Sequence, residues 1–320
     1  MSKHWIKLVT GLMLGLVAGG MLMGQSTPQP ASAEAKAIAF LQREVPAWKR
    51  NNGCFSCHNN GDAVRALYAA TQKGYRLPAE VLADTNAWLS EPLHWDNNKG
   101  DPGFSDKKLA NLQFAAALVA GLEAGQSNSV EPLQQAARKL LSDQSADGSW
   151  KIDEGNLVGS PATWGAALAT WMGVQTLRKA NLAEAQNAQQ KAERWLQQRK
   201  PHNVPTAAIL LFALPRDAAP SRQEALQFLQ RAQTRDGGWG PYADAPPECF
   251  DTALALLALA PLRTQTDIVA TIRRGRDFLI AQQNADGSWP ATTRPSGGDS
   301  YAQMMSTTGW VTLALLETKE

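Results

Sequence analysis

The 320-residue chain is poor in cysteine, with three, and in histidine, with four, and its 31 Lys and Arg nearly balance its 29 Asp and Glu. So few cysteines exclude a small fold built on disulfides. Balanced charge without a cluster of basic residues argues against nucleic-acid binding. Long alternation of apolar and polar residues is also missing, which disfavours half-buried strands. The sequence therefore predicts an all-α fold.

Two of the three cysteines stand in one short motif, Cys54-Phe-Ser-Cys57-His58. This spacing is used to attach a c-type haem, since each thiol can add to a vinyl group while the imidazole coordinates the iron. A zinc site would need about two further ligands, and the third cysteine, Cys249, stands alone; a disulfide or redox dithiol is a further alternative. Asparagine and glycine on both sides predict a loop over 51–61. We expect one covalent haem c on the two thiols, with His58 as the proximal ligand.

The N-terminus is typical of an exported protein. Lys3 and Lys7 precede a charge-free apolar run over 8–24, and Ala31-Ser-Ala33 is a small-x-small cleavage site. We expect a signal peptide over 1–33, a single domain over 34–320, and a periplasmic or secreted location with no membrane span after cleavage. An uncleaved membrane anchor is the alternative, because the run approaches the length of a membrane span.

Apolar residues at helical spacing, broken by Gly, Pro and Asn, predict twelve helices. One helix of each successive pair is amphipathic, as over 222–233, and the next is apolar almost all round, as over 252–259. A helix that is apolar all round must be buried on every side. The alternation therefore predicts an outer layer of helices around an inner one. The expected helices span 35–44, 62–73, 78–90, 106–124, 129–142, 160–179, 183–199, 204–214, 221–233, 249–261, 266–282 and 302–317.

Three loops that follow outer helices share a Gln, then Asp-Gly, then a Trp. Asp-Gly supplies a tight turn in which Gly can take a positive φ. The Trp can cover the boundary between the layers, and the Gln can bind backbone groups of a neighbouring helix. The repeated pairs are Gln144 with Trp150, Gln233 with Trp239, and Gln283 with Trp289.

These segments resemble the QW motif of squalene and oxidosqualene cyclases and their relatives with prenyltransferase-type repeats, most fully over 274–289. The resemblance covers roughly 62–317 and implies an α/α toroid of about six inner and six outer helices. Cyclases of this family carry a proton donor in a D-x-D-D-T-A segment, which 247–253 matches with Phe250 at the donor position. Cyclase activity is therefore not expected from the resemblance. The zinc site of the protein prenyltransferases is not expected either, because no histidine follows His202.

The haem loop should lie on the face where inner helices begin. In a closed ring the second and sixth loops flank the first, so His94, then Met304 or Met305, are the candidate distal iron ligands. Five-coordinate iron is the alternative, since haem sites accept His, Met or an open position. The structural alternatives are a hydrogen-bonded loop histidine and methionines packed in the core.

The expected function is an exported monohaem protein that carries electrons to an unidentified redox partner protein. Alternatives are a haem enzyme or gas sensor with an open axial site, an isoprenoid- or lipid-binding or cyclase-like protein, and a glycan-active toroid. Asp251 is expected to cap an inner helix rather than to act as an acid. The inner aromatic residues either line an apolar cavity or fill the core; they are Trp164, Trp171, Phe212, Phe250, Tyr301 and Trp310.

Overall fold

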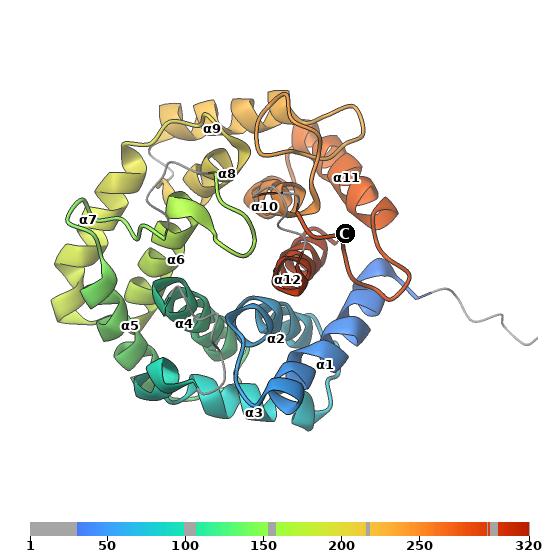
Figure 1. Cartoon of the computed structure of the whole chain (residues 1–320). Helices are drawn as coiled ribbons and strands as arrows, with labels where there is room; N and C mark the ends of the chain where they lie inside the picture. The colour runs from blue at the N-terminus through green and yellow to red at the C-terminus, as the bar shows by residue number, and fades with distance from the viewer. Residues whose placement is uncertain are drawn as a thin grey trace, which may run out of the picture. The chain divides into compact units, whose positions relative to one another are not determined.

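The computed structural model describes residues 31–98, 107–152, 158–215, 218–292, 294 and 300–319. The charged and apolar parts of the predicted signal peptide, within 1–30, lie outside these residues. From Ser32 onward the chain forms one compact unit. In it the described residues form twelve α-helices, arranged as an outer ring around an inner ring (Figure 1). The predicted α/α toroid is confirmed.

Odd-numbered helices make the outer ring and even-numbered helices the inner ring (Figure 1). The outer helices are α1 (Ala33–Asn52), α3 (Ala79–Leu89), α5 (Glu131–Asp143), α7 (Gln186–Gln197), α9 (Ala219–Ala232) and α11 (Thr266–Ala281). The inner helices are α2 (Val64–Gln72), α4 (Lys107–Glu123), α6 (Gly165–Ala180), α8 (Val204–Ala213), α10 (Cys249–Leu259) and α12 (Tyr301–Glu317). Each corresponds to one predicted helix. No helix of the described residues is long and apolar enough to cross a membrane.

The first helix is longer than predicted. It was expected to end at residue 44, before Pro46, because proline gives up one backbone hydrogen bond of a helix. Instead α1 continues through Pro46 to Asn52 and ends at Gly53, whose φ of +70° and N–H bond to the Lys49 carbonyl form a left-handed cap. The last turn of α1 therefore delivers the chain directly to Cys54.

Each of the three repeated loops binds the outer helix before it to the next outer helix, which joins α5 to α7, α9 to α11 and α11 to α1. In each loop the buried Trp donates its indole N–H, at 2.7–3.0 Å, to a carbonyl of the preceding outer helix: Leu140, Leu229 and Leu279. Each Gln donates to the Gly carbonyl of its own loop and to a carbonyl of the next outer helix: Ala188, Thr271 and Ala33. The Gln and Trp of each loop therefore join two outer helices through side-chain hydrogen bonds to backbone carbonyls.

Glycine is required in these loops for two reasons. Gly287 has a φ of +97°, which disfavours any residue with a Cβ. A Cβ there would also run into the backbone carbonyl of Lys36 on α1. Gly275 plays a different part, since it lets the indole of Trp239 lie directly on α11. The repeat thus sets how closely neighbouring outer helices approach.

The ring closes where the last repeat meets the first. Arg276 of α11 pairs with Glu34 of α1 at 2.7 Å and also donates to the Leu315 carbonyl of α12. Ser32 caps α1 by accepting the backbone N–H of Ala35 at 3.2 Å. These contacts hold α12 beside α1, which brings the start of the last inner helix to the motif at Cys54.

Candidate functional site

The Cys-x-x-Cys-His motif opens a π-helix, Cys57–Ala63, at the entrance of the first inner helix. The hydroxyl of Ser56 caps it by accepting the backbone N–H groups of His58, at 3.1 Å, and Asn59, at 3.4 Å. The predicted loop over 51–61 is therefore wrong at both ends, and only 53–56 lies outside a helix. Single-turn π segments are uncommon and frequently occur at functional sites.

Two buried asparagines fix the π-helix to three other elements. Asn60 accepts the Ser56 N–H at 3.0 Å and donates to Thr85 of α3 at 2.8 Å. Asn59 donates to the Tyr301 hydroxyl of α12 at 2.8 Å and to a carbonyl of α1. Both asparagines were predicted to lie in a loop. Two adjacent amides beside an apolar helix are the sequence signal for their burial, because buried amides need hydrogen-bond partners.

The cysteines of the motif differ in burial. Cys54 is 3% exposed and is a thiol rather than half of a disulfide, while Cys57 is partly buried at the first position of the π-helix. Cys249 is remote from the motif in sequence, at the start of α10, and burial raises the pKa of its thiol to about 12. Within the described residues no three His, Cys, Asp or Glu side chains are grouped to hold a bare metal ion.

His58 is held by the last inner helix. Its Nδ1 lies 3.0 Å from the Oγ of Ser306, a fully buried residue of α12. Burial lowers the pKa of His58 to about 4, so the imidazole is neutral at pH 7. Because Nδ1 is engaged by Ser306, Nε2 is the ring nitrogen that remains to bind another group, as in metal-binding histidines held by a second hydrogen bond.

The second loop reaches the motif, but His94 has its own partner. Asn98 accepts the Phe55 N–H at 3.0 Å and donates to the Phe55 carbonyl at 2.6 Å, which places this loop against Cys54. His94 lies in the short helix Pro92–Asn97 with its side chain 64% exposed and its Nδ1 2.6 Å from Glu91. The predicted contact between the first two loops is confirmed, and coordination by His94 stays a prediction.

The start of α12 also reaches the motif, as predicted for the sixth loop, since Ser306 contacts His58. Met305 is fully buried in the core. Met304 is partly buried, and its sulfur accepts a hydrogen bond from Thr308 at 3.8 Å. Neither methionine is shown to be an iron ligand, and both stay candidates.

Aromatic side chains flank the motif on both sides. Phe55 stacks on Trp88 of α3 with ring centroids 4.6 Å apart, and Trp48 of α1 stacks on Tyr301 at 5.4 Å. The indole N–H groups of Trp48 and Trp88 are buried and have no hydrogen-bond partner among the described residues. Buried donors without acceptors are uncommon in proteins. Both donors could serve an acceptor group, such as a carboxylate, bound beside the motif.

Asp62 is a buried acid on the same π-helix that sequence analysis did not single out. Its Oδ2 accepts the Gln113 amide at 2.9 Å and the Trp164 indole N–H at 3.1 Å. Arg65 lies 3.6 Å from Oδ1 and sits over the Trp310 ring at 4.4 Å. Burial raises the pKa of Asp62 to about 7 although Arg65 opposes this shift.

A cavity of about 250 Å³ lies among the inner helices. Of the six aromatic residues predicted for it, Trp171, Phe212 and Trp310 line it, together with Arg65 and Glu123. The other three do not line this cavity: Trp164 and Phe250 pack edge-on against Trp310, and Tyr301 lies at the motif.

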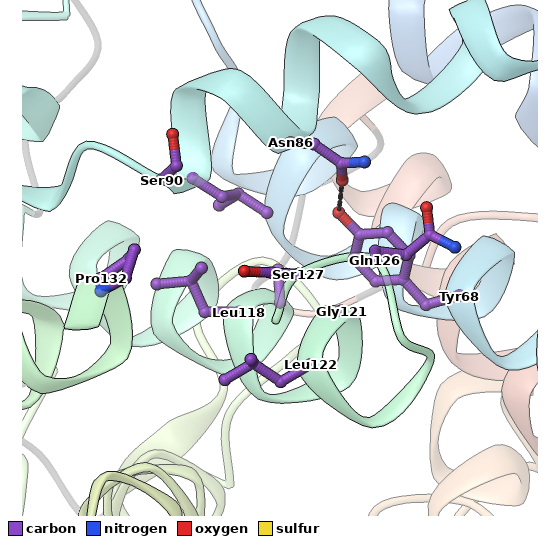
Figure 2. A pocket seen from close by; sticks show the side chains of 11 residues that line it. Tyr68, Asn86, Ser90, Leu118, Gly121, Leu122, Gln126, Ser127 and Pro132 are labelled. Atoms are coloured by element: carbon purple, nitrogen blue, oxygen red, sulfur yellow. Dashed lines mark hydrogen bonds between the residues drawn. The ribbon is translucent and has the colours of Figure 1, made fainter. Parts of the chain in front are cut away.

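A smaller cavity of about 120 Å³ lies between α2, α3 and α4 (Figure 2). In it the Tyr68 hydroxyl donates to Asn86 at 2.6 Å, and Gly121 lies against the tyrosine ring. Burial raises the pKa of Tyr68, so this group stays a neutral phenol. The cavity has room for a few water molecules rather than for a substrate.

Residues 206–320 match the family model described as the squalene-hopene cyclase C-terminal domain. Lanosterol synthase ERG7 of Saccharomyces cerevisiae is 32% identical over 99 residues, which cover 29% of this chain and 13% of the yeast protein. Lanosterol synthase erg7A of Aspergillus fumigatus is 31% identical over 105 residues, with 30% and 13% covered. The matched segments thus span about an eighth of these relatives.

Solved structures extend the likeness to most of the chain. The type II terpene cyclase MstE from Scytonema, in complex with geranylgeranyl dihydroxybenzoate, has a TM-score of 0.57 at 17% identity, over 89% of this chain and 96% of that one. A possible GH105 family member from Salmonella enterica has a TM-score of 0.54 at 11% identity, over 95% and 98%. The chain has the fold of the type II terpene cyclases. At these identities the likeness establishes the fold alone.

The segment that resembles the acid motif of the cyclases leads into α10. Phe250, which the resemblance places at the proton-donor position, is 1% exposed and packs edge-on against Trp310. Asp251 is the third residue of α10, and both its oxygens accept from Arg294, at 2.6 and 2.7 Å. The expectation that Asp251 caps the helix is wrong. Burial raises the pKa of Asp251 to about 6, and the paired Arg294 opposes this shift.

Proposed function

We propose that the protein is an exported monohaem c-type electron carrier, in which Cys54 and Cys57 hold one haem c and His58 is its proximal ligand. The observation that carries this proposal is the contact of His58 Nδ1 with Ser306 Oγ at 3.0 Å. Coordination of the haem iron requires a neutral imidazole, and a hydrogen bond to its other nitrogen fixes the orientation of the ring. The lowered pKa of His58 supports the neutral form.

Two features beside the motif support the proposal. Haem c carries two propionate carboxylates, and the unpartnered indole N–H groups of Trp48 and Trp88 are donors that would suit them. The stacked rings of Phe55 and Trp88 supply an apolar wall that would limit access of water. When bound, the haem would supply a one-electron Fe(III)/Fe(II) couple.

Export is part of the proposal, and the structure bears on the cleavage site. Ser32 caps α1 and the Ala33 carbonyl accepts from Gln283. Cleavage after Ala33 would remove the cap, at a cost of about 1 kcal/mol, together with this acceptor. An uncleaved anchor would keep both. The redox partner would be a protein of the same compartment, docking near the motif.

The test is expression of the full chain with the c-type maturation machinery, followed by peroxidase staining of a denaturing gel. We expect a stained band for the wild type and for Cys249→Ser, which removes the cysteine outside the motif. The Cys54→Ser and Cys57→Ser double variant should be unstained at equal protein load. An unstained wild type that is correctly folded would end the proposal.

A second candidate is binding of an isoprenoid or other lipid in the central cavity. Three aromatic rings line it, and the matched family and relatives support an apolar ligand of this class. Its volume, about 250 Å³, lies just below the usual range of roughly 300–1,000 Å³ for ligand pockets, which favours a short chain. Titration with farnesol should quench tryptophan fluorescence in the wild type. Leu257→Trp, which fills the cavity, should abolish the titration, and equal quenching in both would refute this candidate.

A further inference from the structure

A third cavity, of about 160 Å³, lies between the starts of the inner helices α6 and α8. We call it the α6–α8 cavity. It is lined by the first residues of both helices and by Arg199, His202 and Asn203, which lie between α7 and α8. Among the described residues, no acidic side chain lines it. Its polar wall is therefore made of cationic and neutral groups.

Arg199 brings a positive charge to this cavity without a counter-ion. Its guanidinium lies over the ring of Trp195, 4.5 Å from the centroid, and forms no ion pair within the described part of the chain. Its Nε is buried and has no hydrogen-bond partner there. A partly buried cation is costly unless an anion or an acceptor compensates it. Arg199 therefore lacks the kind of partner that an anionic ligand would supply.

Asn203 adds a buried donor on the same wall. It is only 6% exposed, and it lines the cavity. Its Oδ1 caps α8 by accepting the backbone N–H of Thr206 at 2.8 Å, which leaves the Nδ2 group as the free end of the amide. Within the described residues this NH₂ group has no acceptor. Because buried amides are normally hydrogen-bonded, the Nδ2 group calls for an acceptor inside the cavity.

The start of α6 presents backbone donors to the same space. Trp164 stands at its capping position, where an indole cannot accept, and its own N–H is bound to Asp62. Ala166 and Ala167 line the cavity. Their backbone N–H groups precede the first bond of the helix and have no acceptor among the described residues. The partial positive charge at the start of this 16-residue helix favours an anion.

We propose that the α6–α8 cavity binds a small oxyanion, a carboxylate or phosphate group, between Arg199, the Asn203 amide and the backbone N–H groups of Ala166 and Ala167. Such a group has several acceptor oxygens, so it can satisfy all of these donors together. The volume of about 160 Å³ lies below the roughly 300–1,000 Å³ of ordinary ligand pockets, which favours a small anion. Binding is independent of the haem, since none of these residues belongs to the Cys54 motif.

Binding is tested by ¹H–¹⁵N NMR of the full chain, titrated separately with inorganic phosphate and with acetate at constant ionic strength. We expect saturable shifts of the Ala166 and Ala167 amide signals and of the Arg199 Nε–H signal with at least one probe. Saturation by phosphate alone identifies a phosphate site, saturation by acetate alone a carboxylate site, and saturation by both a general oxyanion site. Shifts that stay linear in both titrations overturn the proposal.

Three variants separate a specific site from general attraction of anions. Arg199→Met keeps an apolar side chain beside Trp195 and should weaken binding by about tenfold or more. Asn203→Asp keeps a good cap for α8 but puts a negative charge in the cavity, and it should abolish saturation. Arg194→Met, the matched control, removes a charge from an exposed position of α7 outside the cavity and should bind like the wild type. Wild-type affinity in either cavity variant overturns the proposal.

Discussion

Gln283 donates its side-chain amide to the carbonyl of Ala33 at 2.9 Å, across 250 residues of sequence. This bond joins the last repeated loop to the first outer helix and closes the ring. It repeats what Gln144 and Gln233 do between neighbouring outer helices. Closure places α12 beside α1, so the contact between Ser306 and His58 depends on the repeat architecture.

Replacing Gln283 with leucine should therefore weaken the ring. In the chain that keeps Ala33, the variant takes one hydrogen bond from each of the part-buried Ala33 and Gly287 carbonyls, which costs about 1–3 kcal/mol for the two together. Urea unfolding measures the loss. Gln144→Leu, at the equivalent position inside the ring, serves as the comparison and should lose a similar amount. A Gln283→Leu variant as stable as the wild type would show that closure does not depend on this bond.

Gly287→Ala should destabilise the protein more than Gly74→Ala does. Both glycines have positive φ, +97° and +86°, so each alanine carries left-handed strain of about 1–2 kcal/mol. Only at Gly287 would the new Cβ meet the Lys36 backbone, whereas nothing lies within 4 Å at Gly74. The difference in unfolding free energy isolates the contact between outer helices. Equal losses in the two variants would contradict it.

Arg294→Met should be strongly destabilising at neutral pH, by about 3–5 kcal/mol, because it leaves the Asp251 carboxylate buried without its cation. Burial already raises the pKa of Asp251 to about 6, and loss of the arginine raises it further. The deficit should shrink as pH falls below that pKa and the carboxyl becomes neutral. Unfolding measured at pH 5 and pH 8 checks both statements, and a deficit independent of pH would argue against the pairing.

The effect of Asp62→Asn on the free energy of unfolding should become more favourable as pH rises. The native pKa of Asp62, about 7, lies above its unfolded value of 3.8, so the native state holds the proton more tightly and loses stability between these values. A rise of two pH units within this range lowers the unfolding free energy of the wild type by about 3 kcal/mol. The stability of the variant relative to the wild type should rise by up to that amount from pH 5 to pH 8. An unchanged difference would mean that Asp62 titrates normally.

The layers of this fold could be predicted because helical spacing and the Gln to Trp repeat are local signals. The course of the chain through the motif could not. Pro46 is a strong stop signal in sequence, yet α1 runs through it because the helix is held by tertiary contacts, such as the pairing of Glu34 with Arg276.

The polar network at the site could not be predicted from the sequence either. Ser306 and Asp62 lie far apart in sequence, and each by itself resembles an ordinary residue near a helix start. Only ring closure brings α12 against the π-helix and makes Ser306 a partner of His58. The burial that shifts the pKa values of His58 and Asp62 likewise depends on both layers being in place.

The central claim, that Cys54 and Cys57 carry a covalent haem, is tested most directly by the intact mass of the chain purified under denaturing conditions after expression with the c-type maturation machinery. We expect the mass of the polypeptide plus one haem, and the same mass also gives the processed N-terminus. The unmodified polypeptide mass, from cells in which a known c-type cytochrome is matured normally, would contradict it.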